Sequence, residues 1–269
     1  MSDQSAAREP LEAEPRNNIG GDASSRTRLR ESRRRRARTD WRQGGRSVRK
    51  WDTTVLAVAL VAVGIGVIAA GAVNRVPAAW SASAATLLLW AGMGIAVALA
   101  FSKSRPAGLL RIRLPDLLWA FGLGLGLRAL QGWMTGANVG EFPTLASLDG
   151  AFPTGWLLTI GLPAAIGAPV VEEFFFRAVV LIAIYQILRR SVGTGAAIAT
   201  AVLMSAGGFV LLHAVGGVLT LQDGIQLFVV GSTCGLFVVL TGRIWGAVLT
   251  HLTYNATYLL LLVVGSVLT

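Results

Sequence analysis

Long apolar runs, separated by short polar or charged segments, dominate the sequence after Trp51. Most of these runs are close to the roughly 20 residues that an α-helix needs to cross the hydrocarbon core of a bilayer. We therefore expect an all-α fold, a polytopic membrane helix bundle of about seven to eight transmembrane helices. The runs lie at residues 53–73, 80–101, 115–135, 154–188, 195–213, 224–241 and 244–266.

The run at 154–188 is longer than one membrane crossing. As a single helix it would extend roughly 52 Å at 1.5 Å per residue, against a hydrocarbon core of about 30 Å. Pro163 and Pro169 each lack a backbone donor, and Gly167 lies between them. We expect the helix to kink or break at these residues, so that its first part can count as a short helix of its own.

The composition agrees with the apolar pattern. Hydrophobic residues make up 54% of the 269 residues and charged residues only 14%, which is too apolar for an ordinary soluble domain. The single cysteine, Cys234, excludes an intramolecular disulfide framework and a cysteine-based zinc cluster. Small residues inside apolar spans usually let helices pack closely. We interpret seven glycines in this way rather than as a phosphate loop: Gly122, Gly124, Gly126, Gly132, Gly136, Gly231 and Gly235.

Residues 1–50 differ from the rest, because they hold fourteen basic and seven acidic residues and almost no aliphatic ones. Such a segment cannot bury enough apolar surface to fold, so we predict a disordered basic cytosolic tail followed by a transmembrane domain at 51–269. A polybasic segment before a first span keeps the N-terminus in the cytosol and contacts membrane lipids. No folded nucleic-acid module accompanies the charges, so we expect no nucleic-acid partner.

The basic residues of the loops favour one orientation in the cell membrane. The run at 53–73 is long enough to be a signal anchor rather than a cleaved signal peptide. With a cytosolic N-terminus, alternation of the spans leaves only Arg75 outside, and the loop with Glu141 and Asp149 also lies outside. The positive-inside rule is then satisfied. The residues expected inside are Lys103, Arg105, Arg111, Arg113, Arg189, Arg190 and Arg243.

Charged side chains within the predicted spans are few. Insertion scales put the cost of each at about 2.5–3.5 kcal/mol, so such residues usually mark function or a specific ion pair. Glu173 and Arg177 stand at i, i+4 in the order that favours a helical ion pair. Glu172 points about 100° away from Glu173 on the same helix. We therefore predict that Glu172 is the free carboxylate that faces the bundle.

Both histidines of the chain also lie inside predicted spans. His213 follows Phe209 by one helical turn, and Asn255 follows His251 by one turn, so each histidine shares a helix face with its neighbour. Either histidine alone is compatible with an ordinary packed residue. Two histidines, an acidic pair and an amide in one apolar bundle together indicate a functional site.

Glu172, the two imidazoles and the amide could hydrolyse an acyl bond. A carboxylate and a neutral imidazole can hold and deprotonate a water molecule, while a second imidazole and an amide can donate to a developing oxyanion. The sequence contains no His-Glu-x-x-His motif, no Gly-x-Ser-x-Gly motif and no pair of mid-span aspartates. The corresponding hydrolase mechanisms are therefore poor alternatives.

Three sequence elements, in order on successive predicted helices, resemble the signature of the CPBP family, also called the CAAX prenyl protease or Abi family. The resemblance covers residues 168–260, inside an expected core at about 115–266, and no functional position is substituted. It implies an intramembrane endopeptidase that acts on a peptide or membrane-protein substrate. The elements are Glu172-Glu173-x-x-x-Arg177, Phe209-x-x-x-His213 and His251-x-x-x-Asn255.

The same resemblance implies a role for each residue. Glu172 and His213 would activate the water, and His251 and Asn255 would form the oxyanion site. The supporting residues would be Glu173, Arg177 and Phe209. We expect a metal-free glutamate mechanism without a cofactor, but a zinc ion held by Glu172, His213 and His251 remains an alternative, since two imidazoles and a carboxylate can form a catalytic zinc site.

Two functions from other classes remain open. A membrane scaffold or bacteriocin-immunity-type protein could use the same fold to bind a peptide without cleaving it. A transporter could use Glu172 and the histidines as a proton relay, although that function would favour inverted repeats or a continuous polar path.

The positions of two further residues along their helices raise questions. Arg128 lies at a depth similar to that of Glu172, so it either pairs with an acidic group or backbone carbonyl or extends toward the outer interface. His251 is only about 12 Å from Arg243 along the last helix, which puts it below Glu172 on a straight-helix estimate. We predict that the cavity nevertheless brings the four catalytic candidates together.

Overall fold

The computed structural model describes residues 25–32, 40–43, 48, 50–137, 139–140, 142–145 and 154–268. The chain divides into two compact units, Met1–Arg36 and Ala37–Thr269. In the first unit, the described residues 25–32 form a helix. The second unit holds the apolar helices, and no strand occurs in the described residues of either unit. The predicted all-α class is confirmed.

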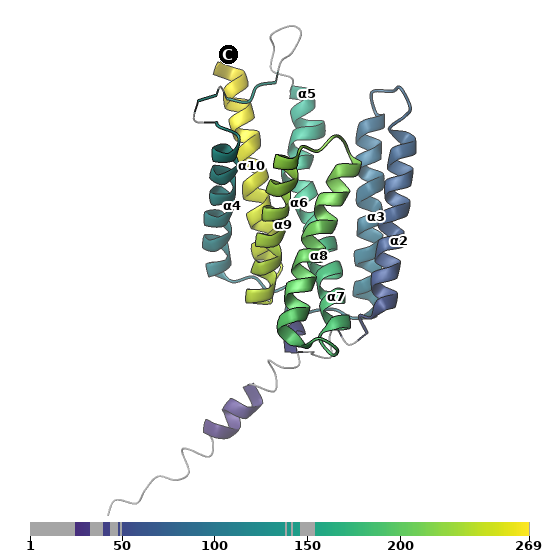
Figure 1. The fold of residues 1–269 in the computed structure, drawn as a ribbon, viewed down its shortest axis with the longest axis vertical. Helices are drawn as coiled ribbons and strands as arrows, with labels where there is room; N and C mark the ends of the chain where they lie inside the picture. The colour runs from purple at the N-terminus through teal and green to yellow at the C-terminus, as the bar shows by residue number, and fades with distance from the viewer. Residues whose placement is uncertain are drawn as a thin grey trace, which may run out of the picture. The chain divides into compact units, whose positions relative to one another are not determined.

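The second unit is a bundle of helices (Figure 1). Between residues 40 and 145, the described elements are η1 (Trp41–Gln43), α2 (Thr53–Val73), α3 (Ser81–Lys103) and α4 (Leu114–Met134). After residue 188, they are α8 (Gly193–Val215), α9 (Leu221–Thr241) and α10 (Trp245–Leu268). By length and composition, α2, α3, α8, α9 and α10 can each cross a membrane. The chain is a multi-pass membrane protein.

The segment 154–188 is helical along its whole length, so the predicted break does not interrupt the helix. Leu162 and Ala168, beside the predicted break points, keep helical dihedral angles. The segment instead contains π-helical turns, whose i→i+5 bonds let a helix pass a proline without ending. Its pieces are α5 (Thr154–Trp156), η3 (Leu157–Gly161), η4 (Pro163–Gly167), α6 (Ala168–Glu173), η5 (Phe174–Val180) and α7 (Leu181–Leu188).

Close contacts between helices depend on some of the glycines and not on others. A Cβ at Gly124 would lie 2.6 Å from the Thr253 side chain and 2.8 Å from the Thr250 carbonyl oxygen, so α4 and α10 touch there. Gly231 and Gly235 of α9 also have close neighbours. The packing role predicted for Gly122, Gly126 and Gly136 is wrong, because a Cβ at any of them would meet no atom within 4 Å. At Gly132 it would meet only an ordinary contact.

One end of the bundle, which we call the basic end, gathers the start of α2 and the loops after α3 and α9. Trp51 Nε1 donates to the Ala100 carbonyl at 3.1 Å, and the Ile244 amide donates to the Leu109 carbonyl at 2.9 Å. Arg243 makes a two-pronged ion pair with Asp116, with nitrogen–oxygen distances of 2.5 and 2.7 Å. These contacts agree with the predicted alternation of the spans. The acidic positions Glu141 and Asp149 lie outside the described residues.

Residues 40–43 are docked on the basic end, although the sequence assigned them to a disordered tail. Trp41 is 1% exposed and packs edge-on against Tyr185 of α7. Arg42 donates to the carbonyl oxygens of Val239 and Leu240 at the end of α9, at 3.0 and 2.6 Å. The boundary predicted at residue 50 therefore lies too far along the chain, because these two side chains bind the membrane helices. The run 33–36 lies outside the described residues.

Candidate active site

Glu172 and Glu173 end α6, at the point where the helix changes to the π-helical η5. Single π turns inside α-helices occur often at functional sites. Both carboxylates are buried, with 9% of Glu172 and 0% of Glu173 exposed. Since an unpaired buried charge is costly, each carboxylate needs a partner nearby.

Arg177 is the partner of Glu173 on the same helix, as the spacing predicts. Arg177 NH1 lies 3.2 Å from Glu173 Oε1, and neither side chain is exposed. Gly231 of α9 provides space for the guanidinium, since a Cβ there would lie 3.0 Å from Arg177 NH2. The ring of Phe209 lies 4.8 Å from Arg177 Cζ, which is a favourable cation–π distance. The predicted ion pair is confirmed, and α8 and α9 enclose it.

His251 of α10 lies between the two carboxylates. Its Nδ1 is 3.0 Å from Glu173 Oε1, and its Nε2 is 3.9 Å from Glu172 Oε2. An ionised carboxylate only accepts hydrogen bonds, so the first contact places a proton on Nδ1. The second distance is too long for a direct hydrogen bond but suits a bridging water. The contact between Glu173 and His251 joins residues of two different helices and does not follow from the sequence pattern.

Phe209 of α8 connects the two histidines. Its ring centroid lies 4.4 Å from that of His213 and 5.5 Å from that of His251. His213 Nδ1 lies 2.9 Å from the Phe209 carbonyl oxygen, one turn back on α8. A carbonyl cannot donate, so Nδ1 of His213 carries a proton. When the ring is neutral, Nε2 then presents a lone pair and is an acceptor.

Asn255 contacts the helix that carries the glutamates. Its Nδ2 donates to the Ala164 carbonyl oxygen at 3.1 Å. The Ala168 amide bonds to Pro163, five residues back, and in that register the donor for Ala164 would be Pro169, which has no N–H. Asn255 therefore satisfies a carbonyl that this π turn leaves without a partner.

The four predicted catalytic residues are joined to different degrees. Glu172 and His251 approach directly, His213 is linked to His251 through the Phe209 ring, and Asn255 is tied to Ala164. The straight-helix estimate for His251 was too simple. The α7–α8 connection lies farther toward the basic end than the start of α10 (Figure 1). The helix that ends with α7 therefore extends beyond the start of α10, which explains how His251 can lie beside the glutamates.

The alternative zinc set is not assembled into one cluster. Among the residues that the structure describes, no three His, Cys, Asp or Glu side chains lie where they could share a metal ion. The imidazole nitrogens also have other neighbours, since both Nδ1 atoms face an oxygen of the protein. We therefore derive no chemical step from a metal at this site.

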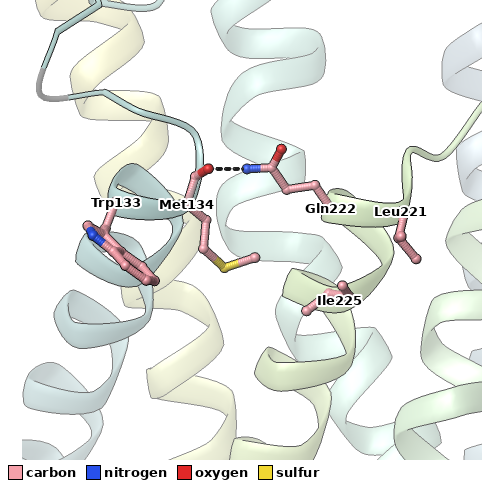
Figure 2. A pocket seen from close by; sticks show the side chains of 5 residues that line it. All are labelled: Trp133, Met134, Leu221, Gln222 and Ile225. Carbon is pink, nitrogen blue, oxygen red and sulfur yellow. Dashed lines mark hydrogen bonds between the residues drawn. The ribbon is translucent and has the colours of Figure 1, made fainter.

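A pocket of about 500 Å³ lies away from the glutamates, between the end of α4 and the start of α9. Figure 2 shows its lining, in which Gln222 Nε2 donates to the Met134 carbonyl oxygen at 2.5 Å. None of its lining side chains is titratable, so the pocket offers no acid or base for the reaction. Its residues are Trp133, Met134, Leu221, Gln222 and Ile225.

Arg128 donates a hydrogen bond to a backbone carbonyl and does not pair with an acidic group among the described residues. Its NH2 donates to the Tyr254 carbonyl oxygen at 2.6 Å, and its NH1 donates to Gln131 Oε1. Among the described residues no carboxylate pairs with it. The predicted pairing with an acidic group is wrong, whereas the predicted contact with a carbonyl is confirmed.

Comparison with known proteins gave one family match. The family model described as "Type II CAAX prenyl endopeptidase Rce1-like" matches residues 154–257. No curated protein and no solved structure matches the chain. The matched segment contains both glutamates, both histidines, Arg177, Phe209 and Asn255. The match over this C-terminal segment supports the resemblance to the CPBP or CAAX protease family that the three sequence elements indicate.

Proposed function

We propose that this protein is an intramembrane endopeptidase in which Glu172 activates a water molecule. The observation that supports the proposal most directly is the placement of His251, with Nδ1 on Glu173 and Nε2 3.9 Å from Glu172. A carboxylate that holds a histidine by Nδ1–H fixes its tautomer and directs Nε2 toward the reacting groups. The gap between Nε2 and Glu172 is wide enough for a water or a substrate oxygen.

His213 is suited to assist Glu172 in water activation. Because Nδ1 of His213 donates to Phe209, its Nε2 can accept a hydrogen bond from the water but cannot donate one while the ring is neutral. Glu172 then removes a proton from this water as the oxygen attacks the carbonyl carbon of the scissile bond. The water is thereby held between two acceptors, one of which is also the base.

His251 and Asn255 are suited to stabilise the resulting oxyanion. His251 stands between two carboxylates, and when both of its ring nitrogens carry a proton, Nε2–H can donate to the oxyanion. Asn255 uses one amide hydrogen for Ala164 and retains a second for the oxyanion. When the tetrahedral intermediate collapses, the carbon–nitrogen bond breaks and Glu172 returns its proton to the leaving amine.

The remaining features of the proposal concern the setting of the reaction. We propose a peptide or membrane-protein substrate, and a prenylated C-terminus is the first class to test because the family model is named for such endopeptidases. The charges of the basic end support a cytosolic N-terminus in the cell membrane and contact with anionic lipids. Nucleic acid is not among the proposed partners, and neither is a resident cofactor.

The deciding experiment compares wild type with Glu172→Gln in a mild detergent, using a library of lipidated and unmodified peptides. Removal of a general base lowers rates by about 10²–10⁴-fold, so we expect kcat to fall by at least about 100-fold without a change in the melting midpoint. Glu31→Gln, the same substitution at an exposed position, is the matched control. A Glu172→Gln variant with near wild-type cleavage would refute the proposed base.

Two further arms of the same experiment separate the alternatives. A strong chelator should leave the rate unchanged, and loss of activity that zinc restores would replace the glutamate mechanism by a metal-dependent one. If wild type and Glu172→Gln bind a peptide equally and neither cleaves it, the protein is a binding scaffold. Cleavage by wild type alone would exclude both the scaffold and the transporter as its sole function.

A further inference from the structure

Arg128 is a charged residue of α4 that the proposed chemistry does not use, and it lies outside the matched family segment. All its described interactions are with α10 or with its own helix. Its NH2 donates to the Tyr254 carbonyl oxygen at 2.6 Å, and its Cζ lies 4.0 Å from the Tyr254 ring centroid and 5.0 Å from that of Tyr258. Two aromatic faces and a carbonyl of α10 therefore hold one half-buried cation.

Gln131 closes these contacts into a ring. Its Oε1 accepts from Arg128 NH1 and also from the Tyr254 hydroxyl, the latter at 2.8 Å. Tyr254 is thus hydrogen-bonded at two points: its carbonyl accepts from Arg128, and its hydroxyl donates to Gln131. A phenol and a carbonyl held on one helix face fix the rotation of α10 about its axis more firmly than apolar contacts alone.

The contacts of Arg128 and Gln131 with Tyr254 lie in the part of α10 that carries His251 and Asn255. Tyr254 comes three residues after His251 and directly before Asn255. One residue of helix corresponds to about 100° of rotation, so a rotation of α10 moves His251 away from both glutamates and Asn255 away from Ala164. Gly124, one turn before Arg128, lets the two helices touch closely enough for the guanidinium to reach the Tyr254 carbonyl.

We propose that Arg128 is a positioning residue: by holding Tyr254 it sets the rotation of α10 and so aims His251 and Asn255 at the reacting groups. The role rests on the proposed endopeptidase function for its effect on rate. Its effect on the geometry of His251 does not depend on that function. The two can therefore be tested separately.

The histidine content of the chain makes the geometry measurable. His213 and His251 are the only histidines, so ¹⁵N-histidine labelling of the full chain, purified with a tag that lacks histidine, gives two imidazole spin systems. Replacing each histidine in turn assigns them. In Arg128→Met we expect the His251 signals to move, because its hydrogen bond to Glu173 changes, while those of His213 stay. Arg75→Met, at an exposed position, is the control and should move neither.

Activity provides the second measurement. A misplacement of about 1 Å can cost roughly 100-fold in rate, so we expect kcat of Arg128→Met to fall about 10- to 100-fold while KM changes less than about threefold. Arg128→Lys keeps a cation that can donate to Tyr254 but not also to Gln131, and it should recover part of kcat. A variant in which kcat and the His251 signals recover together supports positioning rather than a general loss of folding.

The outcomes distinguish the two proposals. If the His251 signals move in Arg128→Met but wild type cleaves nothing, the positioning role stands and the proposed function falls. If Arg128→Met does not fold, Gln131→Leu decides, because it opens the same ring while the charge stays. Unchanged His251 signals in whichever of these variants folds would overturn the positioning role.

Discussion

Replacing Glu173 by glutamine should destabilise the protein strongly, because Arg177 would become a buried cation without its counter-charge. Both side chains are fully buried, and the nitrogen–oxygen distance is 3.2 Å. At an effective dielectric constant of about 20, two unit charges at that distance attract by about 5 kcal/mol. Removal of one partner from a buried pair costs about 3–5 kcal/mol. We expect a loss of that size in the free energy of unfolding.

The reverse variant, Arg177→Met, should cost less than Glu173→Gln. Glu173 keeps a second partner in His251, at 3.0 Å. Apart from the ion pair with Glu173, the guanidinium nitrogens of Arg177 have no acceptor among the described residues. The double variant contains no unpaired charge and should recover most of the loss, since apolar replacement of a buried pair is often close to neutral.

A double-mutant cycle tests this reasoning. We would measure the free energy of unfolding by SDS titration of the purified protein from a mild detergent, with Glu31→Gln as the exposed control. The coupling energy between the two sites should be at least about 2 kcal/mol. Additive effects of the two single variants, or a loss below about 1 kcal/mol in Glu173→Gln, would show that the pair does not hold the site together.

Two predictions concern packing and the basic end. Gly124→Ala should lower the free energy of unfolding by about 1–3 kcal/mol, because the new methyl group overpacks the contact with α10. The controls Gly122→Ala and Gly126→Ala should be neutral or stabilising, since a Cβ there meets no atom. Equal melting midpoints for all three variants would contradict the close contact between α4 and α10 at Gly124. Asp116→Asn should cost about 1.5–3 kcal/mol through its ion pair with Arg243. The double variant Asp116→Asn with Arg243→Met should be less stable than Asp116→Asn alone by no more than about 0.5 kcal/mol. If a denaturant titration shows that the losses of the two single variants add fully, the pairing is ruled out.

Hydropathy alone was sufficient to predict the long helices of the bundle, but not the helix at residues 25–32 or η1. Helix α2 lies at the predicted residues, and the other long helices start or end within three residues of their predicted bounds. The largest difference, at the start of α9, has a polar cause. Thr220 and Asp223 form a capping box, which extends the helix to residues that an apolar run excludes. The docking of residues 40–43 was not predicted, because it depends on two single side chains, Trp41 and Arg42, which do not form an apolar run.

The candidate site could be predicted within single helices but not between them. The pair Glu173–Arg177 follows from i, i+4 spacing, which depends only on helical geometry. The position of His251 between the carboxylates depends on where α10 starts relative to α7, which the chain does not encode locally. The bond from Asn255 to Ala164 had one local signal, the missing N–H of Pro169, but its meaning required the π register of the helix.

The docking of residues 40–43 has a practical consequence for protein production. A truncation placed where the apolar sequence begins, near residue 51, removes the basic charges together with Trp41 and Arg42. It would then leave the Val239 and Leu240 carbonyls without their guanidinium donor. A defect of such a protein could then come either from weaker attraction to anionic lipids or from the loss of the Arg42 cap at the end of α9. A boundary at Ala37, where the compact unit begins, removes nine of the fourteen basic residues at 1–50 and keeps the cap.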